Sequence, residues 1–258
     1  MEKCLIIFDI DETLYLNSEK RIPESTLMAL DKLKEAGHTL GIATGRAPFE
    51  IFDGIKALPF DFFVMANGQL VTYQGTTIYE NPIAVETIEE IVAFAEEKNV
   101  YLGFNAATRS AVTGMSERME DAFAHYYEVV PEIDATIFKS EPIFQIWFFS
   151  DEHDAFAEQF RGKARLIPWL SNGADIVPLE CSKATGMRAL VEAFHGRLPQ
   201  KMVFFGDGTN DIELVEMADI GVAMGNAVEA LKEKADFIAK RIEDDGIYEA
   251  CQQLGLFN

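Results

Sequence analysis

The sequence has few of the residues that build disulfide scaffolds or zinc sites. Its three cysteines, Cys4, Cys181 and Cys251, are an odd number without metal-type spacing. The four histidines are scattered along the chain and form no cluster in sequence. We therefore expect reduced, buried thiols and no disulfide framework.

Positive charge is also scarce. Lys and Arg total 22 against 43 Asp and Glu, which gives a formal net charge of −21. Such a charge repels nucleic acids and anionic lipid surfaces, so we expect neither a nucleic acid nor a membrane as a partner. Any phosphate group that this protein binds must meet positive charge assembled locally.

The start of the chain has no long apolar run. Glu2 and Lys3 form no basic leader region, and the apolar run at residues 4–8 is too short for a signal peptide or a membrane span. We therefore predict a cytoplasmic location.

Apolar residues are plentiful, at 48% of 258 residues, which is enough for one large core or two modest ones. Apolar strand-like runs alternate with helical patterns at both ends of the chain. This alternation predicts an α/β fold with a doubly wound, mostly parallel sheet. The predicted strands are 4–8, 39–43, 62–66, 202–205, 220–223 and 237–238, and the predicted helices are 23–35, 49–58, 183–193, 227–234 and 243–254.

The middle of the chain has a different order of elements. A hairpin at residues 70–79 is followed by strands that pair without a helix between them, which is typical of an α+β layer. We predict an inserted α+β domain at residues 82–181, and a discontinuous core made of residues 1–81 and 182–258. The predicted elements of the insert are helices 85–97, 117–127 and 151–160, and strands 101–105, 110–113, 143–149, 164–168 and 174–177.

Two acids follow the first predicted strand. Asp9 and Asp11 share one face of an extended segment, so one carboxylate can attack phosphorus while the other moves a proton to or from the leaving group. Thr13 can fix this loop through a hydroxyl-to-backbone hydrogen bond. The alternative is a solvated turn that only ends a strand.

The second strand ends in Thr44-Gly45-Arg46, where a small hydroxyl and a glycine let the main chain approach a phosphate oxygen. Arg46 fits phosphate binding and an ordinary salt bridge equally well. Lys183 opens a later helix, with Met187, Leu190, Val191 and Phe194 expected to face inward. Its ammonium can reach phosphate and Asp9, or it can be an ordinary solvated lysine.

A later strand ends in Gly206-Asp207-Gly208-Thr209-Asn210-Asp211, which supplies oxygen ligands on a tight turn. The alternative is a helix N-cap made by Thr209 or Asp211. One carboxylate and one phosphate charge 4 Å apart repel by about 4 kcal/mol at an effective dielectric of 20. A divalent cation reverses this repulsion, and ligation by oxygen alone favours Mg²⁺ over Zn²⁺.

These four motifs, in this order and at strand ends, resemble those of the haloacid dehalogenase superfamily. The insert is similar to the type IIB cap of its Cof-type phosphatases, so the resemblance covers nearly the whole chain. It implies that Asp9 is the nucleophile that becomes aspartyl-phosphate, and that Asp11 is the general acid and base. It also implies further roles: Thr44, Gly45 and Lys183 in phosphate binding, Asp9, the Asp11 carbonyl and Asp207 in holding Mg²⁺, and Thr13, Arg46, Asn210 and Asp211 in support.

The sequence departs from the family pattern at three positions. Glu12 and Ala184 replace the usual glycines, and Gln69 replaces a small residue. Glu12 adds charge beside the nucleophile loop, so it can narrow the substrate range or slow turnover. The departure at Glu12 leaves in place every residue that carries the reaction.

The resemblance implies a Mg²⁺-dependent phosphatase acting on small phosphorylated metabolites such as sugar phosphates, with pyridoxal phosphate or flavin mononucleotide as alternatives. A phosphotransferase or sugar phosphomutase is a second alternative, and a non-catalytic receiver-like phospho-acceptor is a distant third. Aromatic and basic residues of the insert are candidates for specificity, although most of the aromatic residues suit a cap core: Phe104, Tyr126, Tyr127, Phe144, Trp147, Trp169, Arg109, Arg118, Lys139 and Arg165.

Overall fold

The structure is a computed structural model that describes residues 2–126, 130–170 and 173–257. The chain folds into two compact units. Unit 1 comprises Met1–Arg46, Phe52–Glu80 and Ser182–Asn258, and unit 2 comprises Ala47–Ile51 and Asn81–Cys181. The described residues contain no helix that is both long and apolar enough to span a membrane.

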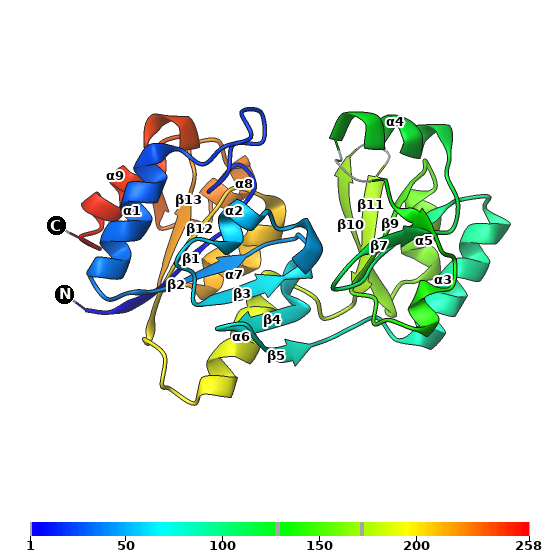
Figure 1. Ribbon diagram of the computed structural model, residues 1–258, viewed down its shortest axis with the longest axis horizontal. Helices are drawn as coiled ribbons and strands as arrows, with labels where there is room; N and C mark the ends of the chain where they lie inside the picture. Colours follow the sequence, from blue (N-terminus) through cyan, green and yellow to red (C-terminus); the bar gives the residue numbers. More distant parts are fainter. Residues whose placement is uncertain (1, 127–129, 171–172, 258) are drawn as a thin grey trace. The chain divides into compact units, whose positions relative to one another are not determined.

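Unit 1 is built on a sheet that takes strands from both ends of the chain (Figure 1). Its order within the described residues is β14-β13-β12-β1-β2-β3-β4-β5, with parallel pairing from β14 to β3 and antiparallel pairing for the last two strands. The strands are β1 (Cys4–Phe8), β2 (Thr39–Ala43), β3 (Phe62–Met65), β4 (Leu70–Tyr73), β5 (Thr76–Glu80), β12 (Lys201–Gly206), β13 (Ile220–Ala223) and β14 (Phe237–Ile238). The predicted mostly parallel sheet is confirmed.

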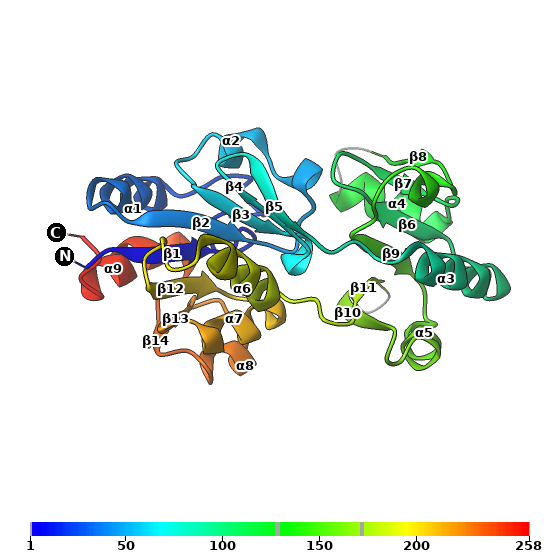
Figure 2. The ribbon, with the colours of Figure 1, turned by 90° about the horizontal axis from the view of Figure 1, so that it is seen from below.

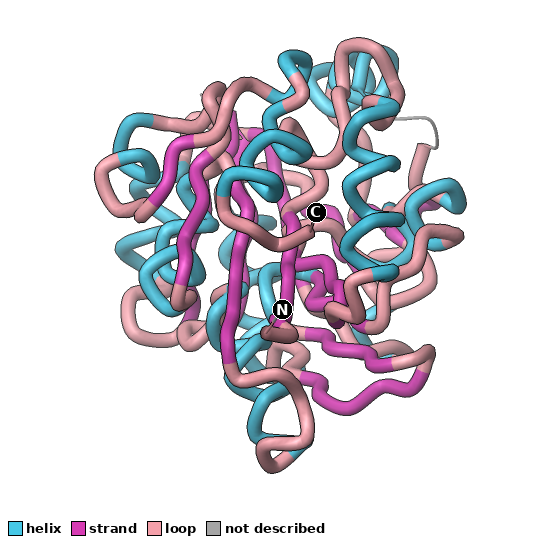
Figure 3. Tube along the Cα trace, turned by 90° about the vertical axis from the view of Figure 1, so that its left-hand side faces the viewer, coloured by secondary structure: helices cyan, strands magenta, loops and turns pink. Residues whose placement is uncertain are grey.

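Helices pack on the sheet of unit 1 as the doubly wound prediction requires (Figures 2 and 3). One helix, α1, contacts β2 and α9, whereas α6 contacts β3, β4 and α7. The helices of unit 1 are α1 (Glu24–Glu35), α2 (Asp53–Lys56), α6 (Lys183–Phe194), α7 (Ile212–Met217), α8 (Glu229–Lys232) and α9 (Gly246–Gln253). Val191 was predicted to face inward, but 36% of its surface is exposed, so this prediction is wrong.

The predicted helix at 49–58 is wrong as one element. The chain instead forms a 3₁₀ turn at Pro48–Glu50 and the short helix α2, with Ile51 and Phe52 in extended conformation between them. The Phe52 ring lies against the Arg46 guanidinium and the Tyr15 ring, at 4.5 Å and 5.0 Å from its centroid. These tertiary contacts of Phe52 override the local helical preference.

The strand register places the residues that follow β1, β2 and β12 side by side. Phe8 pairs with Phe205 on one side and with Ile42 on the other, so the residues that follow β1, β12 and β2 emerge at one edge. All five residues of β1 are buried, as expected for a strand with neighbours on both sides and helices on both faces. The fold therefore gathers three of the four motifs at the carboxyl ends of parallel strands, where α/β sheets bind ligands.

Unit 2 has its own sheet and core (Figure 2). Within the described residues the strand order is β10-β11-β9-β6-β7-β8. The strands are β6 (Leu102–Asn105), β7 (Ser110–Val112), β8 (Glu132–Ile133), β9 (Gln145–Phe149), β10 (Ala164–Leu170) and β11 (Gly173–Pro178), and the helices are α3 (Val85–Glu97), α4 (Glu117–Tyr126) and α5 (His153–Gln159). The sequence pattern missed β8, because a strand of two residues leaves no periodicity.

Five of the ten specificity candidates in the insert pack or form ion pairs within unit 2. Phe104 and Phe144 are 0% and 1% exposed, and Trp147 packs in a small cluster with Phe149. Arg109 forms ion pairs with Glu132, Asp134 and Glu141, and Arg118 pairs with Asp151. The side chains of Tyr126, Tyr127 and Trp169 lie outside the described part of the chain.

A buried histidine anchors the start of the sheet to the end of the chain. His38 is 3% exposed, and its Nδ1 accepts a hydrogen bond of 3.0 Å from the Cys4 N–H. Because a backbone N–H can only donate, Nε2 carries the proton and donates to the Leu256 carbonyl at 2.7 Å. His38 is thus a structural residue, as the scattered histidines suggested.

We expect His38→Leu to lower the free energy of unfolding by about 2 to 4 kcal/mol, because it leaves a buried N–H and a buried carbonyl without their partner. Urea unfolding followed by circular dichroism measures this loss. The exposed His195→Asn serves as the control, since asparagine tolerates the left-handed backbone at that position, and we expect a change below about 0.5 kcal/mol. Equal stability of the two variants would contradict the assignment.

Candidate active site

Asp9, directly after β1, is the centre of the site. It is 6% exposed, its N–H donates to the Phe205 carbonyl at 2.9 Å, and its Oδ1 lies 2.8 Å from the Lys183 Nζ. Burial raises the pKa of Asp9 well above its usual range, and the Asp211 and Asp207 carboxylates add to this rise while Lys183 opposes it. Asp9 is therefore a carboxylate that depends on nearby positive charge to stay ionised.

Lys183 supplies that charge from the first turn of α6. Its side chain is fully buried, with Nζ 2.8 Å from Asp9 and 2.6 Å from Asp211. Although burial lowers the pKa of Lys183, the two carboxylates outweigh burial and raise it. The N-cap Ser182 accepts a hydrogen bond from the Thr185 N–H at 3.2 Å and so fixes the start of the helix. The alternative of a solvated lysine is wrong.

The loop after β12 is shaped by Asp211, which is 0% exposed. One of its oxygens, Oδ2, accepts hydrogen bonds of 2.9 Å from the N–H groups of both Asp207 and Gly208. Asp211 is the third residue of the 3₁₀ turn Thr209–Asp211, which runs directly into α7, and its bond from the Gly208 N–H caps the start of that turn. Asp211 therefore both caps this turn and organises the loop. Thr13 donates its hydroxyl to the Asp207 Oδ1 at 3.0 Å, whereas the sequence had suggested a backbone partner.

Three carboxylates converge at these strand ends. One oxygen from each of Asp9, Asp207 and Asp211 lies within 4.8 Å of the others. Burial, followed by the Asp211 charge, raises the pKa of Asp207 to about 7, although Thr13 and Lys183 oppose the rise. These three carboxylates are hard oxygen donors, and together they carry more negative charge than Lys183 can neutralise. Such a set of ligands fits a divalent cation such as Mg²⁺.

Asp11 and Arg46 form a two-bonded ion pair beside this cluster. The Arg46 Nε and Nη2 donate to the two Asp11 oxygens at 2.9 Å and 2.7 Å, and the guanidinium lies over the Phe52 ring. Burial alone would raise the pKa of Asp11, but the Arg46 hydrogen bonds and charge bring it below its ordinary value. The sequence suggested either phosphate binding or a salt bridge for Arg46, and in the structure Arg46 forms the salt bridge.

The tip of β2 is closely packed. Thr44 is 0% exposed, its hydroxyl accepts from the Arg46 N–H at 3.1 Å, and its own N–H donates to the Val64 carbonyl. A Cβ added to Gly45 would lie 3.3 Å from the Asn67 Oδ1 and 3.5 Å from the Asn210 Nδ2. A side chain at position 45 would therefore crowd the amides that neighbour it.

Two asparagines in the site were missed from the sequence. Asn226, after β13, donates to the Glu12 carbonyl at 2.8 Å, and Asn67, after β3, accepts from Asn210 at 3.0 Å. Both asparagines follow a strand of the parallel part of the sheet, and that position in the sequence could have indicated that they belong to the site. Glu12 has a left-handed backbone with φ of 55°, which glycine adopts most readily, so the backbone suits the glycine that the resemblance implies at this position.

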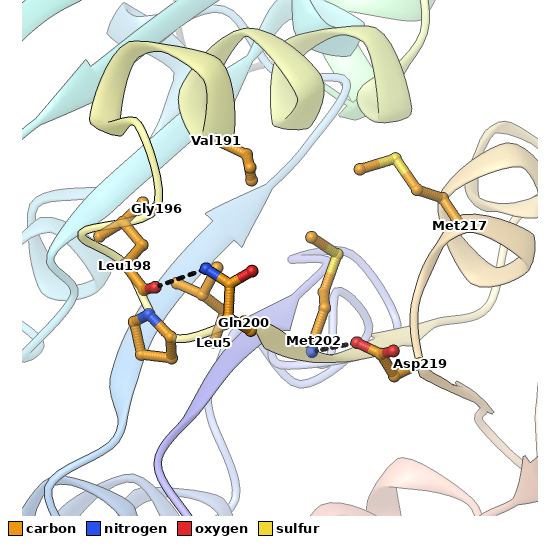
Figure 4. A pocket seen from close by; sticks show the side chains of 9 residues that line it. Leu5, Val191, Gly196, Leu198, Gln200, Met202, Met217 and Asp219 are labelled. Atoms are coloured by element: carbon orange, nitrogen blue, oxygen red, sulfur yellow. Dashed lines mark hydrogen bonds between the residues drawn. The ribbon is translucent and has the colours of Figure 1, made fainter.

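A separate cavity of about 150 Å³ lies near the starts of the strands, lined mainly by apolar side chains that include Leu5, Met202 and Met217 (Figure 4). The Asp219 carboxylate beside it accepts from the Met202 N–H at 2.7 Å. This cavity and the acidic cluster are at opposite ends of β1 and β12, so it takes no part in the site.

The chain is similar to one known family over almost its whole length. It matches the model of the haloacid dehalogenase-like hydrolases over residues 6–251. It is 35% identical over 260 residues to YkrA of Bacillus subtilis (strain 168), named a phosphatase, and the match covers 99% of each chain. A solved subclass IIB sugar phosphatase superposes with a TM-score of 0.86 at 29% identity, covering 99% of this chain and 100% of the other.

A further relative is the pyridoxal phosphate phosphatase YbhA of Escherichia coli (strain K12), 28% identical over 257 residues and covering 92% of this chain and 93% of its own. The sequence match, the fold and the resemblance of the motifs agree. The chain therefore belongs to the haloacid dehalogenase-like hydrolase family, in which it is a phosphoric monoester hydrolase.

Proposed function

We propose that this protein is a Mg²⁺-dependent phosphatase that hydrolyses small phosphorylated metabolites, sugar phosphates first, through an aspartyl-phosphate intermediate. The observation that carries the proposal is the buried contact between Asp9 and Lys183 beside a cluster of three carboxylates. An arrangement of this kind serves phosphoryl transfer, which depends mainly on positioning and on charge placed around the phosphoryl group.

In the proposed first step, an Asp9 oxygen attacks phosphorus and the bond from phosphorus to the ester oxygen breaks. Asp11, in its protonated form, gives its proton to the leaving oxygen. In the second step a water attacks phosphorus, Asp11 takes the proton of that water, and the bond to Asp9 breaks. Lys183 stabilises the negative charge of the phosphoryl oxygens, with Thr44 and Gly45 lining the same position.

The residues that would hold Mg²⁺ are Asp9, the Asp11 main-chain carbonyl and Asp207, with Asn210 and Asp211 in support. Bound there, the ion supplies positive charge against the phosphate and the clustered carboxylates. Thr13 orients Asp207 through its hydroxyl, and Asp211 holds the loop that carries Asp207.

For substrate choice we propose that the predicted insert at residues 82–181, which makes up most of unit 2, is the cap domain. The solved sugar phosphatase of subclass IIB is similar over the whole chain, which supports a sugar phosphate. Pyridoxal phosphate is the alternative substrate, because the relative YbhA is named a pyridoxal phosphate phosphatase. Because most of the insert's aromatic residues whose side chains the structure describes are buried in unit 2, we assign no specificity residue among them.

We expect Mg²⁺ to bind more weakly as the pH falls below about 7, because a proton and the metal compete for Asp207. The loss approaches about tenfold per pH unit if one proton is displaced. Titration calorimetry at pH 6, 7 and 8, in two buffers of different ionisation enthalpy, measures both the affinity and the proton release. A constant affinity from pH 6 to 8 would contradict this expectation.

The test of the proposed function is a panel of phosphorylated metabolites incubated with the purified protein and Mg²⁺. We expect phosphate release from sugar phosphates, and one atom of ¹⁸O in the released phosphate when the reaction runs in ¹⁸O-water. Transfer to a second sugar without label in phosphate would indicate a phosphotransferase or mutase instead. A stable phosphoprotein without turnover would indicate a receiver-like switch.

A further inference from the structure

Three successive residues after β3 have a left-handed backbone. The φ angles of Ala66, Asn67 and Gly68 are 49°, 53° and 96°. Residues other than glycine adopt this conformation at a cost of about 1 to 3 kcal/mol each, and they keep it only where the surrounding structure holds them. Segment 66–68 is thus held in place by its contacts.

The first set of contacts joins the segment to the loop after β2. The Asn67 N–H donates to the Thr44 carbonyl at 3.0 Å, and the Ala66 N–H donates to the Arg46 carbonyl at 2.8 Å. These bonds fix the segment against the proposed phosphate-binding residues Thr44 and Gly45.

A second contact joins the segment to the loop after β12. Asn67 is 4% exposed, and its Oδ1 accepts a hydrogen bond of 3.0 Å from the Asn210 Nδ2. Asn210 lies between Asp207 and Asp211, so this side-chain pair joins the loop after β3 to the loop that carries two of the three clustered carboxylates.

The third contact is with the start of α6. A Cβ added to Gly68 would lie 1.9 Å from the Ser182 carbonyl oxygen, and one added to Gly186 would lie 2.8 Å from the Gly68 Cα. The backbone of segment 66–68 therefore packs directly on the helical turn that carries Lys183. One strained segment touches three of the four motifs.

We propose that Asn67 is a positioning residue, which acts through Asn210 to hold the metal-binding loop in register with the phosphate-binding loop. The inference rests on the proposed function, since it assigns a task within the same site. Residues behind metal ligands typically change metal affinity by about 10- to 100-fold when they are replaced. Asn67 is such a residue, because its hydrogen bond to the amide of Asn210 connects it to the loop that carries Asp207 and Asp211.

The decisive variant is Asn67→Gly, because glycine keeps the left-handed backbone while removing the amide. Titration calorimetry with MgCl₂ as the probe measures metal affinity without turnover. We expect about tenfold or greater weakening of Mg²⁺ binding in Asn67→Gly. In the background of Asn210→Ala, which also weakens binding, adding Asn67→Gly should change the affinity less than twofold.

Asn99→Gly is the matched control, because Asn99 is an exposed asparagine with φ of 54° at the end of α3. It should bind Mg²⁺ as the wild type does. Equal weakening by Asn67→Gly in both backgrounds, or no weakening at all, would overturn the positioning role.

Asn210→Ala leaves segment 66–68 untouched and breaks the same bond. If Asn67→Gly does not fold, Mg²⁺ binding by Asn210→Ala within twofold of the wild type would overturn the role. A wild-type chain that binds no Mg²⁺ would overturn the metal part of the proposed function together with this inference. Binding by the wild type with unchanged variants would overturn the inference alone.

Discussion

Asp9→Asn is expected to lower kcat by at least about 10⁴-fold, since an amide cannot form the bond to phosphorus that the carboxylate forms. The fold should persist, because asparagine has the same shape and Lys183 keeps its ion pair with Asp211 at 2.6 Å. Initial rates on the best ester of the metabolite panel measure the loss. Mass spectrometry of quenched samples should find phosphoenzyme in the wild type and none in the variant.

Asp31→Asn is the control for that experiment, since Asp31 is an exposed residue of α1. We expect its rate to stay within twofold of the wild type. If Asp9→Asn retained more than a few per cent of the wild-type rate, another group would have to be the nucleophile.

Lys183→Met is expected to affect stability as well as rate. It removes the ammonium that lies between Asp9 and Asp211, both of which are buried, and leaves their charges uncompensated. Loss of one partner from a buried ion pair costs about 3 to 5 kcal/mol. Urea unfolding measures this loss, and we expect turnover to fall below detection because the phosphoryl oxygens lose their cation.

The control for Lys183→Met is Lys240→Met, which breaks an ion pair of 2.8 Å with Glu249 where the lysine side chain is 57% exposed. Exposed pairs of this kind contribute about 0 to 1 kcal/mol. A loss for Lys183→Met no larger than that of the control would show that the buried pair contributes little. Added Mg²⁺ should recover part of the stability of Lys183→Met, because the ion replaces some of the missing positive charge.

The sequence predicted the sheet of unit 1 well because its strands are short apolar runs that end in polar residues. Parallel strands end at one edge, so Asp9, Thr44 and Asp207 could be placed together from the sequence. Lys183 was harder, since a lysine at the start of a helix is usually solvated. Only the pairing with Asp9 and Asp211 distinguishes it.

Other parts of the site could not be predicted from the sequence because they depend on tertiary contacts. The pairing of Arg46 with Asp11 involves residues 35 positions apart and a guanidinium that also lies over Phe52. The same Phe52 interrupts the predicted helix at 49–58. Asn67 and Asn226 give ordinary turn signals in the sequence, and their hydrogen-bond partners are 143 and 214 positions away.

The ion pair between Arg46 and Asp11 has a consequence for the enzyme before its substrate arrives. While the guanidinium donates to both oxygens, Asp11 stays ionised and has no proton to give. A phosphate dianion competes for that guanidinium more strongly than a neutral or singly charged solute does. In the proposed mechanism, Asp11 in the resting protein is therefore unable to act as the acid, and a substrate dianion that draws the Arg46 guanidinium to itself would let Asp11 take up a proton from water.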